Sequence, residues 1–405
     1  MIIGIIREGK VPPDFRVPLT PKQCKAILTL NPQVEIHVQK SNIRIFPDHE
    51  YEDFGIKVVD ELTDCDIILG VKEVPIDMLI PKKTYLFFSH TIKKQIHNQK
   101  LLRALLDKKI RLIDYEIIKD KFNKRLIGFG RYAGIVGCYN SFLTWGLKFS
   151  SYKLKPAHLC HDRKEVEKEL SKVILPKNFR AVLTGFGRVG NGAREILSLL
   201  PIKEVSPEEF ISEEFNEPIF THLDTEDYYI RKDGNEFVKS EFYSNPSLFK
   251  SDFQKFAFES DLYIACHYWS SKSPVILEKE TLLSPENRIK VVGDISCDVN
   301  GPIASTIRAS KIGDAVYGYD AKSNQEVDFR STNAIAVMAI DNLPCELPRD
   351  ASEDFGNELI KHVLPKLLGS DVDNVIGRAT QTNFDGELMP DFKYLEDYAN
   401  GILVS

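Results

Sequence analysis

Four basic residues in the first third of the sequence stand at the ends of expected strands or in loops, and their types suit proton transfer and anion binding. Lys72 comes directly after the run Ile-Ile-Leu-Gly-Val, and His90 comes directly after Tyr-Leu-Phe-Phe-Ser. A lysine at the end of a buried strand loses hydration, which lowers its pKa, and histidine exchanges protons near neutral pH. Arg16 and Arg131 carry the guanidinium group that clamps carboxylates through paired hydrogen bonds. Together they predict a cationic cleft for a carboxylate substrate.

Each of these side chains also has an ordinary structural use. Lys72 can pair with the neighbouring Glu73, the two arginines can form salt bridges within their loops, and His90 can cap a following helix. Ion pairs and caps are common in proteins, so a single basic residue does not identify a site. The presence of all four residues together favours a catalytic site over these structural uses.

A glycine-rich motif begins at Gly185, directly after an apolar run over residues 180–184 and before a helical pattern that reaches about residue 200. In this motif the first glycine permits a tight turn, the second lets the backbone approach a pyrophosphate, and the third lets helix and strand pack closely. The helix N-terminus offers N–H donors to phosphate. We therefore predict a dinucleotide site that includes these residues: Gly185, Gly187, Arg188, Val189 and Gly190.

The residue that would contact the adenine ribose is expected about 20 positions further on, at the end of the next strand. The sequence Ile202–Val205 reads as that strand, which places Ser206 at its tip and Glu204 inside it. Ser206 leaves room for a 2′-phosphate, whose charge Lys203 or Arg188 could meet. The cofactor is therefore NAD or NADP, and the sequence leaves both open.

Short apolar runs that alternate with helical segments predict an α/β fold with parallel sheets. In the first part of the chain these runs cover residues 2–6, 34–38, 67–70, 85–89 and 110–114. We predict two Rossmann-like domains flanked by helices, with the active-site cleft between them. Residues 1–140 plus 330–405 form a discontinuous catalytic domain, and residues 141–329 form the NAD(P)-binding domain. Residues 206–251 read as an insertion, with a hairpin near 228–238.

Composition excludes several classes of protein. The chain has 405 residues, a formal net charge of −6 and 43% hydrophobic residues, so it has neither the basic footprint of a nucleic-acid-binding protein nor the composition of a disordered one. No apolar run approaches the ~18 residues of a membrane span. Seven widely spaced cysteines without a Cys-x-x-Cys pair predict free thiols and a cytoplasmic location. The run His158–Asp162 lacks further ligands at suitable spacing, so we predict no metal site.

Six motifs, taken in their order, resemble the saccharopine dehydrogenase (lysine-forming) and lysine–ketoglutarate reductase family, within the alanine dehydrogenase and transhydrogenase group. They are Leu69-Gly-Val-Lys72-Glu, Thr84-Tyr-Leu-Phe-Phe-Ser-His90-Thr-Ile-Lys93, Ile110-Arg-Leu-Ile-Asp-Tyr-Glu116, Phe129-Gly-Arg-Tyr-Ala-Gly134, Gly293-Asp294-Ile-Ser-Cys-Asp298 and Asp341-Asn-Leu-Pro-Cys-Glu-Leu-Pro-Arg349. The resemblance covers nearly the whole chain. It ends with the sequence at Ser405, so we expect no saccharopine-cleaving half.

The resemblance implies roles for particular residues. Lys72 and His90 would be the acid–base pair, and Glu116 would tune the charge of the lysine. The remaining implied residues bind substrate or cofactor: Arg16, Arg131 and Asp341 on the substrate side, and Asp294 and Asp298 on the nicotinamide side. Arg131 and Ser206 depart from residues that some relatives carry at these positions.

The resemblance also implies the reaction, in which NAD(P)H reduces the imine formed by L-lysine and 2-oxoglutarate, giving saccharopine. Another amino-acid or opine dehydrogenase, such as an alanine dehydrogenase, uses the same acid–base types, and a non-catalytic NAD(P)-binding sensor or partner subunit is a third reading. The expected partners are small-molecule substrates, an amino acid and a 2-oxo acid, with no nucleic acid and no membrane. The sequence is compatible with a homo-oligomer.

Overall fold

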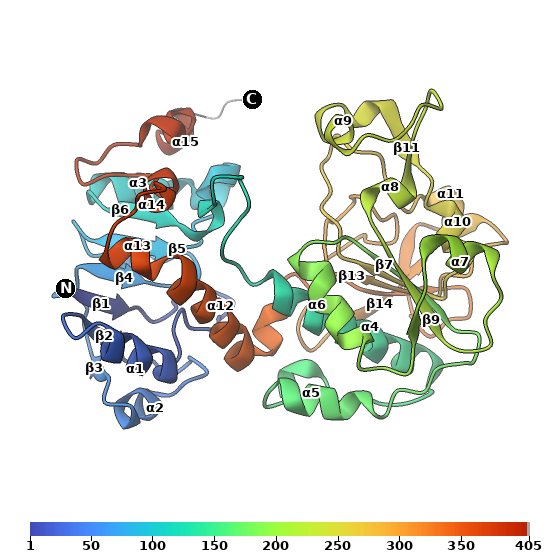
Figure 1. Cartoon of the computed structure of the whole chain (residues 1–405), viewed down its shortest axis with the longest axis horizontal. Helices are drawn as coiled ribbons and strands as arrows, with labels where there is room; N and C mark the ends of the chain where they lie inside the picture. Colours follow the sequence, from blue (N-terminus) through green and yellow to red (C-terminus); the bar gives the residue numbers. More distant parts are fainter. Residues whose placement is uncertain (403–405) are drawn as a thin grey trace. The chain divides into compact units, whose positions relative to one another are not determined.

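The computed structural model describes residues 1–402, which form two compact units (Figure 1). The first unit contains Met1–Phe129 together with the chain from Pro348 onward, and the second contains Gly130–Leu347. Within residues 1–402, no helix has the length and apolar character needed to cross a membrane. All seven cysteines lie in this described part and none of them forms a disulfide.

The first unit is built on one sheet whose six strands are all parallel, in the order β3-β2-β1-β4-β5-β6. The strands are β1 (Ile2–Ile5), β2 (Glu35–Gln39), β3 (Lys57–Val59), β4 (Ile67–Leu69), β5 (Thr84–Phe87) and β6 (Arg111–Asp114). Buried side chains alternate between the two faces, as a sheet covered on both sides requires. Ile67 and Leu69 belong to one core cluster and Ile68 belongs to the other.

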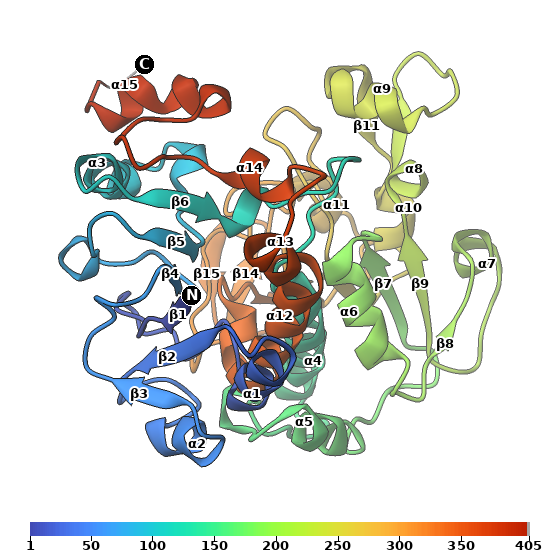
Figure 2. The same cartoon turned by 60° about the vertical axis from the view of Figure 1, so that its left-hand side comes forward.

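Helices from both ends of the chain cover this sheet, as Figure 2 shows for the blue and red segments. They are α1 (Pro21–Leu30), α2 (Asp48–Asp53), α3 (Gln99–Asp107), α12 (Pro348–His362), α13 (Leu364–Leu368), α14 (Val375–Ala379) and α15 (Glu396–Ala399). Helix α1 begins as the sequence predicts, because Thr20 and Gln23 form a capping box and Pro21 occupies the first turn. Core residues of α12 pack in the same cluster as those of β1 and β2.

The second unit has an eight-stranded sheet in the order β15-β14-β16-β13-β12-β7-β9-β8. Its strands are β7 (Arg180–Thr184), β8 (Lys203–Glu204), β9 (Ile219–Leu223), β12 (Leu262–Ala265), β13 (Val291–Asp294), β14 (Val316–Asp320), β15 (Gln325–Val327) and β16 (Ile335–Met338). Strand β14 pairs antiparallel with β16 and with β15, whereas the others are parallel. The predicted α/β class is confirmed, and the sheet is parallel except at this edge, where β14 runs antiparallel to both of its neighbours.

Helices of the second unit are α4 (Gly130–Phe149), α5 (Arg163–Leu170), α6 (Arg188–Leu197), α7 (Pro207–Ser212), α8 (Thr225–Tyr228), α9 (Lys239–Ser244), α10 (Gln254–Ala257) and α11 (Lys279–Leu283). Helix α4 approaches α6 so closely that a Cβ on Gly134 would lie 1.9 Å from the Val189 oxygen. This packing puts residues 130–140 in the second unit, and β16 likewise puts residues 330–347 there. Both segments were expected in the first domain.

The insertion is folded. Strands β10 (Tyr229–Arg231) and β11 (Phe249–Ser251) form a separate antiparallel pair, and α9 lies between them in the chain. The tight hairpin expected near 228–238 is therefore absent from the described residues, because the partner strand comes some 20 residues later in the sequence. More importantly, β9 lies inside the segment that we took for an insertion, and it is the direct neighbour of β7.

Candidate functional site

Charged residues of the first unit gather at one edge of its sheet. Because β1, β4, β5 and β6 are parallel neighbours, the residues that follow them lie along a single edge. Glu8 follows β1, Lys72 and Glu73 follow β4, and His90 follows β5. The strand order reverses between β1 and β4, which is the place where open α/β sheets bind ligands. The sequence thus places its acid–base candidates where this fold class presents its chemistry.

Lys72 is half-buried, and within residues 1–402 its ammonium group makes no hydrogen bond or ion pair. Burial lowers the pKa of Lys72, and the nearby positive charges of Arg16 and Lys10 lower it further, whereas Asp14 and Glu73 oppose that shift. A lysine in this setting releases its proton more easily than a lysine in water. Lys72 therefore has the character that the sequence predicted for a proton-transfer group.

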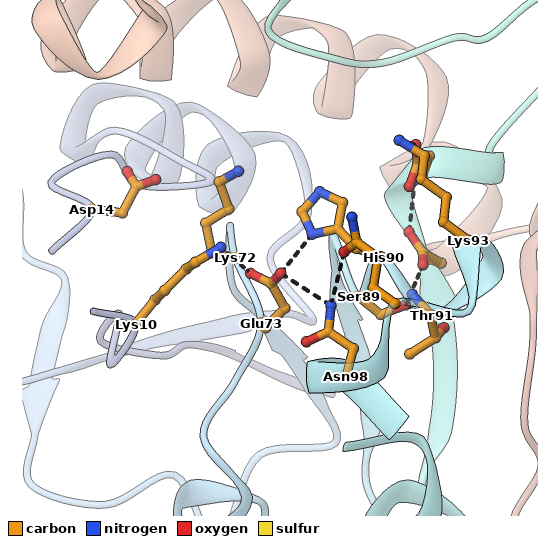
Figure 3. Close-up of polar contacts among 12 residues, drawn as sticks. Lys10, Asp14, Lys72, Glu73, Ser89, His90, Thr91, Lys93 and Asn98 are labelled. Atoms are coloured by element: carbon orange, nitrogen blue, oxygen red, sulfur yellow. Dashed lines mark hydrogen bonds and ion pairs between the residues drawn. The ribbon is translucent and has the colours of Figure 1, made fainter. Parts of the chain in front are cut away.

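Glu73 connects two basic side chains. Its carboxylate lies 2.7 Å from the His90 Nδ1 and accepts a hydrogen bond of 2.9 Å from the Lys10 ammonium, as Figure 3 shows. Burial alone would raise the pKa of Glu73, but the hydrogen bonds from His90 and Lys10 hold it well below its usual range. The ionised Glu73 fixes one nitrogen of the His90 ring and leaves the other nitrogen for a ligand. The pairing of Glu73 with Lys72, which we considered from the sequence, is only a longer-range attraction.

Arg16 is fully buried beside Asp14. Its Nε and Nη2 donate hydrogen bonds of 2.9 and 2.6 Å to the two Asp14 oxygens, and its guanidinium lies 4.1 Å from the centre of the Phe129 ring. Burial would raise the pKa of Asp14, but the charge and hydrogen bonds of Arg16 outweigh it and keep Asp14 ionised. Arg16 is therefore held in a fixed orientation within electrostatic range of Lys72.

Glu8 is a buried acid that the sequence analysis missed. Its two oxygens accept hydrogen bonds from the backbone N–H groups of Val71 and Lys72, at 2.7 and 3.0 Å. Burial and the charge of Asp14 raise the pKa of Glu8 to about 8. The pair Arg7-Glu8 reads as the polar end of a strand, and the signal that could have found Glu8 is its position two residues after the apolar run over residues 2–6.

Glu116 lies two residues after the end of β6 and forms an ion pair of 3.1 Å with Lys93. Its second oxygen is buried and has no hydrogen-bond partner among the described residues. Its backbone N–H donates to Asp114, the last residue of β6. The structure therefore gives Glu116 a cationic partner in Lys93, whereas the resemblance pointed to Lys72.

In the second unit, the glycine motif forms the turn from β7 to α6. Gly185 has a φ of +95°, which favours glycine, and a Cβ on Gly190 would lie 1.7 Å from the Gly185 oxygen. A Cβ on Gly187 would meet nothing within 4 Å, and Gly187 caps α6 without a side-chain hydrogen bond. The open space at Gly187 and the uncapped helix start fit a pyrophosphate.

Ser206 does not lie at the tip of the strand that neighbours β7. It is the N-cap of α7, where it forms a capping box with Glu209, and β8 lies at the edge of the sheet. The neighbour of β7 is β9, and Asp224 follows directly after it. The Asp224 carboxylate forms an ion pair with Lys239 at 2.7 and 2.6 Å, and this pair holds the pKa of Asp224 below its usual value against the effect of burial. An apolar run followed by Asp is the signal that could have found it.

The other residues implied by the resemblance lie in the second unit. Asp294 ends β13 and is buried, where it accepts hydrogen bonds from Ser296 and Thr306, and burial raises its pKa. Asp298 and Asp341 are exposed. Arg131 lies on α4 of the second unit, is 41% exposed and pairs with Glu195, whereas Arg16 belongs to the first unit.

Comparison with known proteins identifies the relatives of this chain. Residues 4–136 match the family described as "Alanine dehydrogenase/PNT, N-terminal domain". The chain is 31% identical over 401 residues to an α-aminoadipic semialdehyde synthase of Arabidopsis thaliana, across 88% of this chain and 38% of that protein. It is 27% identical over 386 residues to a saccharopine dehydrogenase (NAD(+), L-lysine-forming) of Schizosaccharomyces pombe, across 91% and 93% of the two chains. The chain is a homologue of both enzymes.

The resemblance drawn from the six motifs is thereby confirmed. The chain spans less than half the length of the α-aminoadipic semialdehyde synthases that it matches, including the Mus musculus protein, which is 30% identical. Solved structures share the fold across nearly the whole chain. An L-alanine dehydrogenase has a TM-score of 0.64 at 15% identity, covering 98% of this chain and 100% of its own, and a transhydrogenase from Sinorhizobium meliloti has a TM-score of 0.59 at 14% identity, covering 97% and 100%.

Proposed function

We propose that this protein is an NAD(P)-dependent oxidoreductase that joins L-lysine and 2-oxoglutarate reductively into saccharopine, in a reversible reaction. The observation that carries the proposal is the cluster of Lys72, Glu73 and His90 at the carboxyl edge of the first sheet, with Arg16 in electrostatic range. The homology to enzymes named for saccharopine and aminoadipic semialdehyde supports the choice of substrates.

The residues of the first unit divide the proton transfers between them. Lys72, whose pKa is lowered, takes a proton from the ε-ammonium of the substrate lysine, so that the free amine attacks the keto carbon of 2-oxoglutarate. His90, with one ring nitrogen fixed by Glu73, gives a proton to the carbinolamine oxygen as it leaves as water. We assign Arg16 to the substrate carboxylates, as the resemblance implies, and Asp14 orients its guanidinium through two hydrogen bonds. The resulting imine is the group to be reduced.

The second unit supplies the reductant. When bound, a nicotinamide cofactor would deliver the hydride that reduces the imine carbon. Gly187 and the start of α6 would hold its pyrophosphate, because a Cβ at Gly187 meets open space and the N-cap residue makes no side-chain hydrogen bond to the helix.

A spectrophotometric assay tests this function. NADH or NADPH oxidation should require both L-lysine and 2-oxoglutarate, and Lys72→Met or His90→Gln should each lower kcat at least ~100-fold, because each removes a proton-transfer group. The matched controls are Lys100→Met and His49→Gln, which change exposed residues of the same unit outside this cluster. They should keep wild-type kcat.

Three results would contradict the proposal in different ways. Oxidation of alanine with NAD+, or reduction of pyruvate with ammonium, but no turnover with lysine, would make the protein an alanine dehydrogenase. Cofactor binding without turnover of any amine and keto acid pair would make it a sensor or partner subunit. Wild-type activity in the Lys72 and His90 variants would contradict the catalytic roles proposed for these two residues, but not the proposed reaction.

We further propose that NAD is preferred over NADP. Asp224 follows the strand next to the glycine turn, where a carboxylate accepts a hydrogen bond from a ribose 2′-hydroxyl and repels a 2′-phosphate. Its ion pair with Lys239 keeps it ionised and also lessens that repulsion. Discrimination between the cofactors should therefore depend on both residues, in opposite directions.

Fluorescence titration with NADH and NADPH measures this preference without any turnover. Asp224→Ser should lower the ratio of NADH to NADPH affinity about tenfold, the effect of losing one charge repulsion in a partly exposed site. Lys239→Ala should raise the ratio. Glu226→Gln changes an exposed neighbour of Asp224 and should leave it unchanged. An unaltered ratio in Asp224→Ser would show that another residue selects the cofactor.

A further inference from the structure

Four side chains form a closed ring of hydrogen bonds beneath His90. Ser89 Oγ contacts Asp114 Oδ2 at a very short distance and Thr91 Oγ1 at 2.7 Å. Thr91 Oγ1 lies 2.8 Å from Gln381 Oε1, and Gln381 Nε2 lies 3.1 Å from Asp114 Oδ2. All four residues are completely buried. They come from three separate parts of the chain, since Gln381 belongs to the segment after α14.

The number of hydrogens in this ring is informative. The four contacts each need one hydrogen, whereas the Ser89 hydroxyl, the Thr91 hydroxyl and the Gln381 amide supply one each to the ring. Turning the Gln381 amide over reverses the direction of the ring and leaves the same shortfall. The fourth hydrogen has to come from the Asp114 carboxyl. Burial favours the same neutral form, since it raises the pKa of Asp114 to about 6.

The ring includes the residues on either side of His90 in the chain. Ser89 and Thr91 are its two chain neighbours, and His90 itself has φ 51° and ψ 20°, a left-handed conformation that is uncommon for residues other than glycine. Without support this turn would relax and move the imidazole. The Thr91 N–H also donates to Ser89 Oγ at 3.3 Å, which fastens the turn from within.

We propose that Asp114 is a positioning residue that works as a neutral acid: its proton closes the ring with Ser89, Thr91 and Gln381 and so holds His90 in its left-handed turn. This inference rests on the proposed function of His90 as a proton donor. Asp114 does not touch substrate in this scheme. It acts only through the turn.

The charged groups around Asp114 are few among the described residues. The Glu116 N–H donates to Asp114 Oδ1 at 2.8 Å, while the charge of the Glu116 carboxylate favours the neutral acid. The His90 ring has the opposite effect on Asp114. Tyr394, from the C-terminal segment, is within electrostatic range. When Asp114 ionises, the ring therefore loses its fourth hydrogen. Among the described residues, no basic side chain bonds to the carboxylate and could supply that hydrogen instead.

Two substitutions test whether Asp114 acts as a neutral acid or as an ionised carboxylate. Asparagine is neutral, and its amide nitrogen can donate to Ser89 and, once the Gln381 amide turns over, to the Gln381 oxygen, while its own oxygen accepts from the Glu116 N–H. Asp114→Asn should therefore keep kcat within about threefold. Asp114→Ala opens the ring and should lower kcat about 10- to 100-fold with little change in KM, the expected cost of a misplaced catalytic group. The control Thr380→Val removes an equally buried hydroxyl, bonded to Ile376 instead of the ring, and should keep kcat.

The pH profile and two spectra complete the test. The wild type should lose kcat at the pH where Asp114 ionises, and Asp114→Asn should lack that limb. The infrared absorption of protonated carboxyls at pH 5, to which Glu8 also contributes, should lose one component in Asp114→Asn relative to the wild type. The His90 ring signal in NMR should shift in Asp114→Ala alone. Equal losses in Asn and Ala variants, or no loss in Ala, would overturn the proposal. If the wild type does not turn over lysine and 2-oxoglutarate, the proposed function fails, and the two spectra still decide the ring.

Discussion

The two units prepare their sites by different physical means. In the first unit, charged side chains are buried and compensate one another, as in the Arg16–Asp14 pair and the contact of Glu73 with His90 and Lys10. In the second unit, the glycine turn offers backbone N–H groups and open space, and its defining residues are those without side chains. The site of the first unit depends on buried charges that compensate one another, and the site of the second unit depends on glycines that leave space beside the backbone.

This difference determines how each site should respond to change. A site of balanced charges should respond to pH and to the loss of a partner, because an uncompensated buried charge is costly. A site made by close backbone approach should respond to a single added methyl group.

Gly190→Ala should be the most damaging change in the second unit. Its Cβ would lie 1.7 Å from the Gly185 oxygen, so backbone must move, and the free energy of unfolding should fall by about 3 kcal/mol or more. Gly187→Ala meets no atoms and should cost below about 1 kcal/mol, yet it should weaken NADH binding about tenfold by filling the pyrophosphate space. Chemical denaturation and fluorescence titration measure the two effects. Equal stability of both variants would contradict this account of the turn.

Glu8→Gln should change the pH dependence of stability. In the folded protein the pKa of Glu8 is about 8, above its unfolded value of roughly 4.3, so the folded state binds the extra proton. The contribution of Glu8 is therefore fully present at low pH and is lost as pH rises from about 4 to 8, by roughly 1 kcal/mol per pH unit. Relative to the wild type, Glu8→Gln should gain stability across that window. Urea denaturation at several pH values, with the exposed Glu61→Gln as control, checks this; parallel curves would refute it.

Arg131→Ala should have the smallest effect. The Arg131–Glu195 pair is partly exposed, and such pairs contribute below about 1 kcal/mol, so kcat/KM should change less than about threefold. Arg16→Ala, in contrast, should raise KM for the keto acid at least tenfold, because it also leaves Asp14 buried without its partner. Steady-state kinetics compares them. A large KM increase in Arg131→Ala would restore the substrate role that its motif implied.

The sequence predicted what depends on local pattern. Apolar runs identified β1, β4 and β5, and the position of Lys72 and His90 directly after such runs was enough to group them, since parallel strands share a carboxyl edge. Strand pairing is a tertiary property. The antiparallel β14 and the assignment of β16 to the second unit depend on partners that no local run identifies.

The acids were harder to predict than the bases. Asp224 was missed because the long segment before β9 separates it from the glycine turn by more than the usual spacing, and Ser206 stood at the expected distance. Asp114 and Glu8 were missed because a carboxylate after a strand reads as a polar surface residue. The contact of Asp114 with Ser89 and the contact of Glu8 with the Lys72 backbone are what distinguish these two acids from surface carboxylates.

The order of synthesis gives the path of the chain a further consequence. All strands of the second unit lie between Arg180 and Met338, whereas the first unit needs the Gln381 N–H to bond the Leu112 oxygen, at 2.8 Å, across a large sequence separation. Contacts between distant residues form late, and domains fold as units during translation. On the ribosome, the second unit can therefore complete its fold before the first unit, whose sheet still lacks the contact made by Gln381. The residues proposed to move protons gain their support only when Gln381 has emerged.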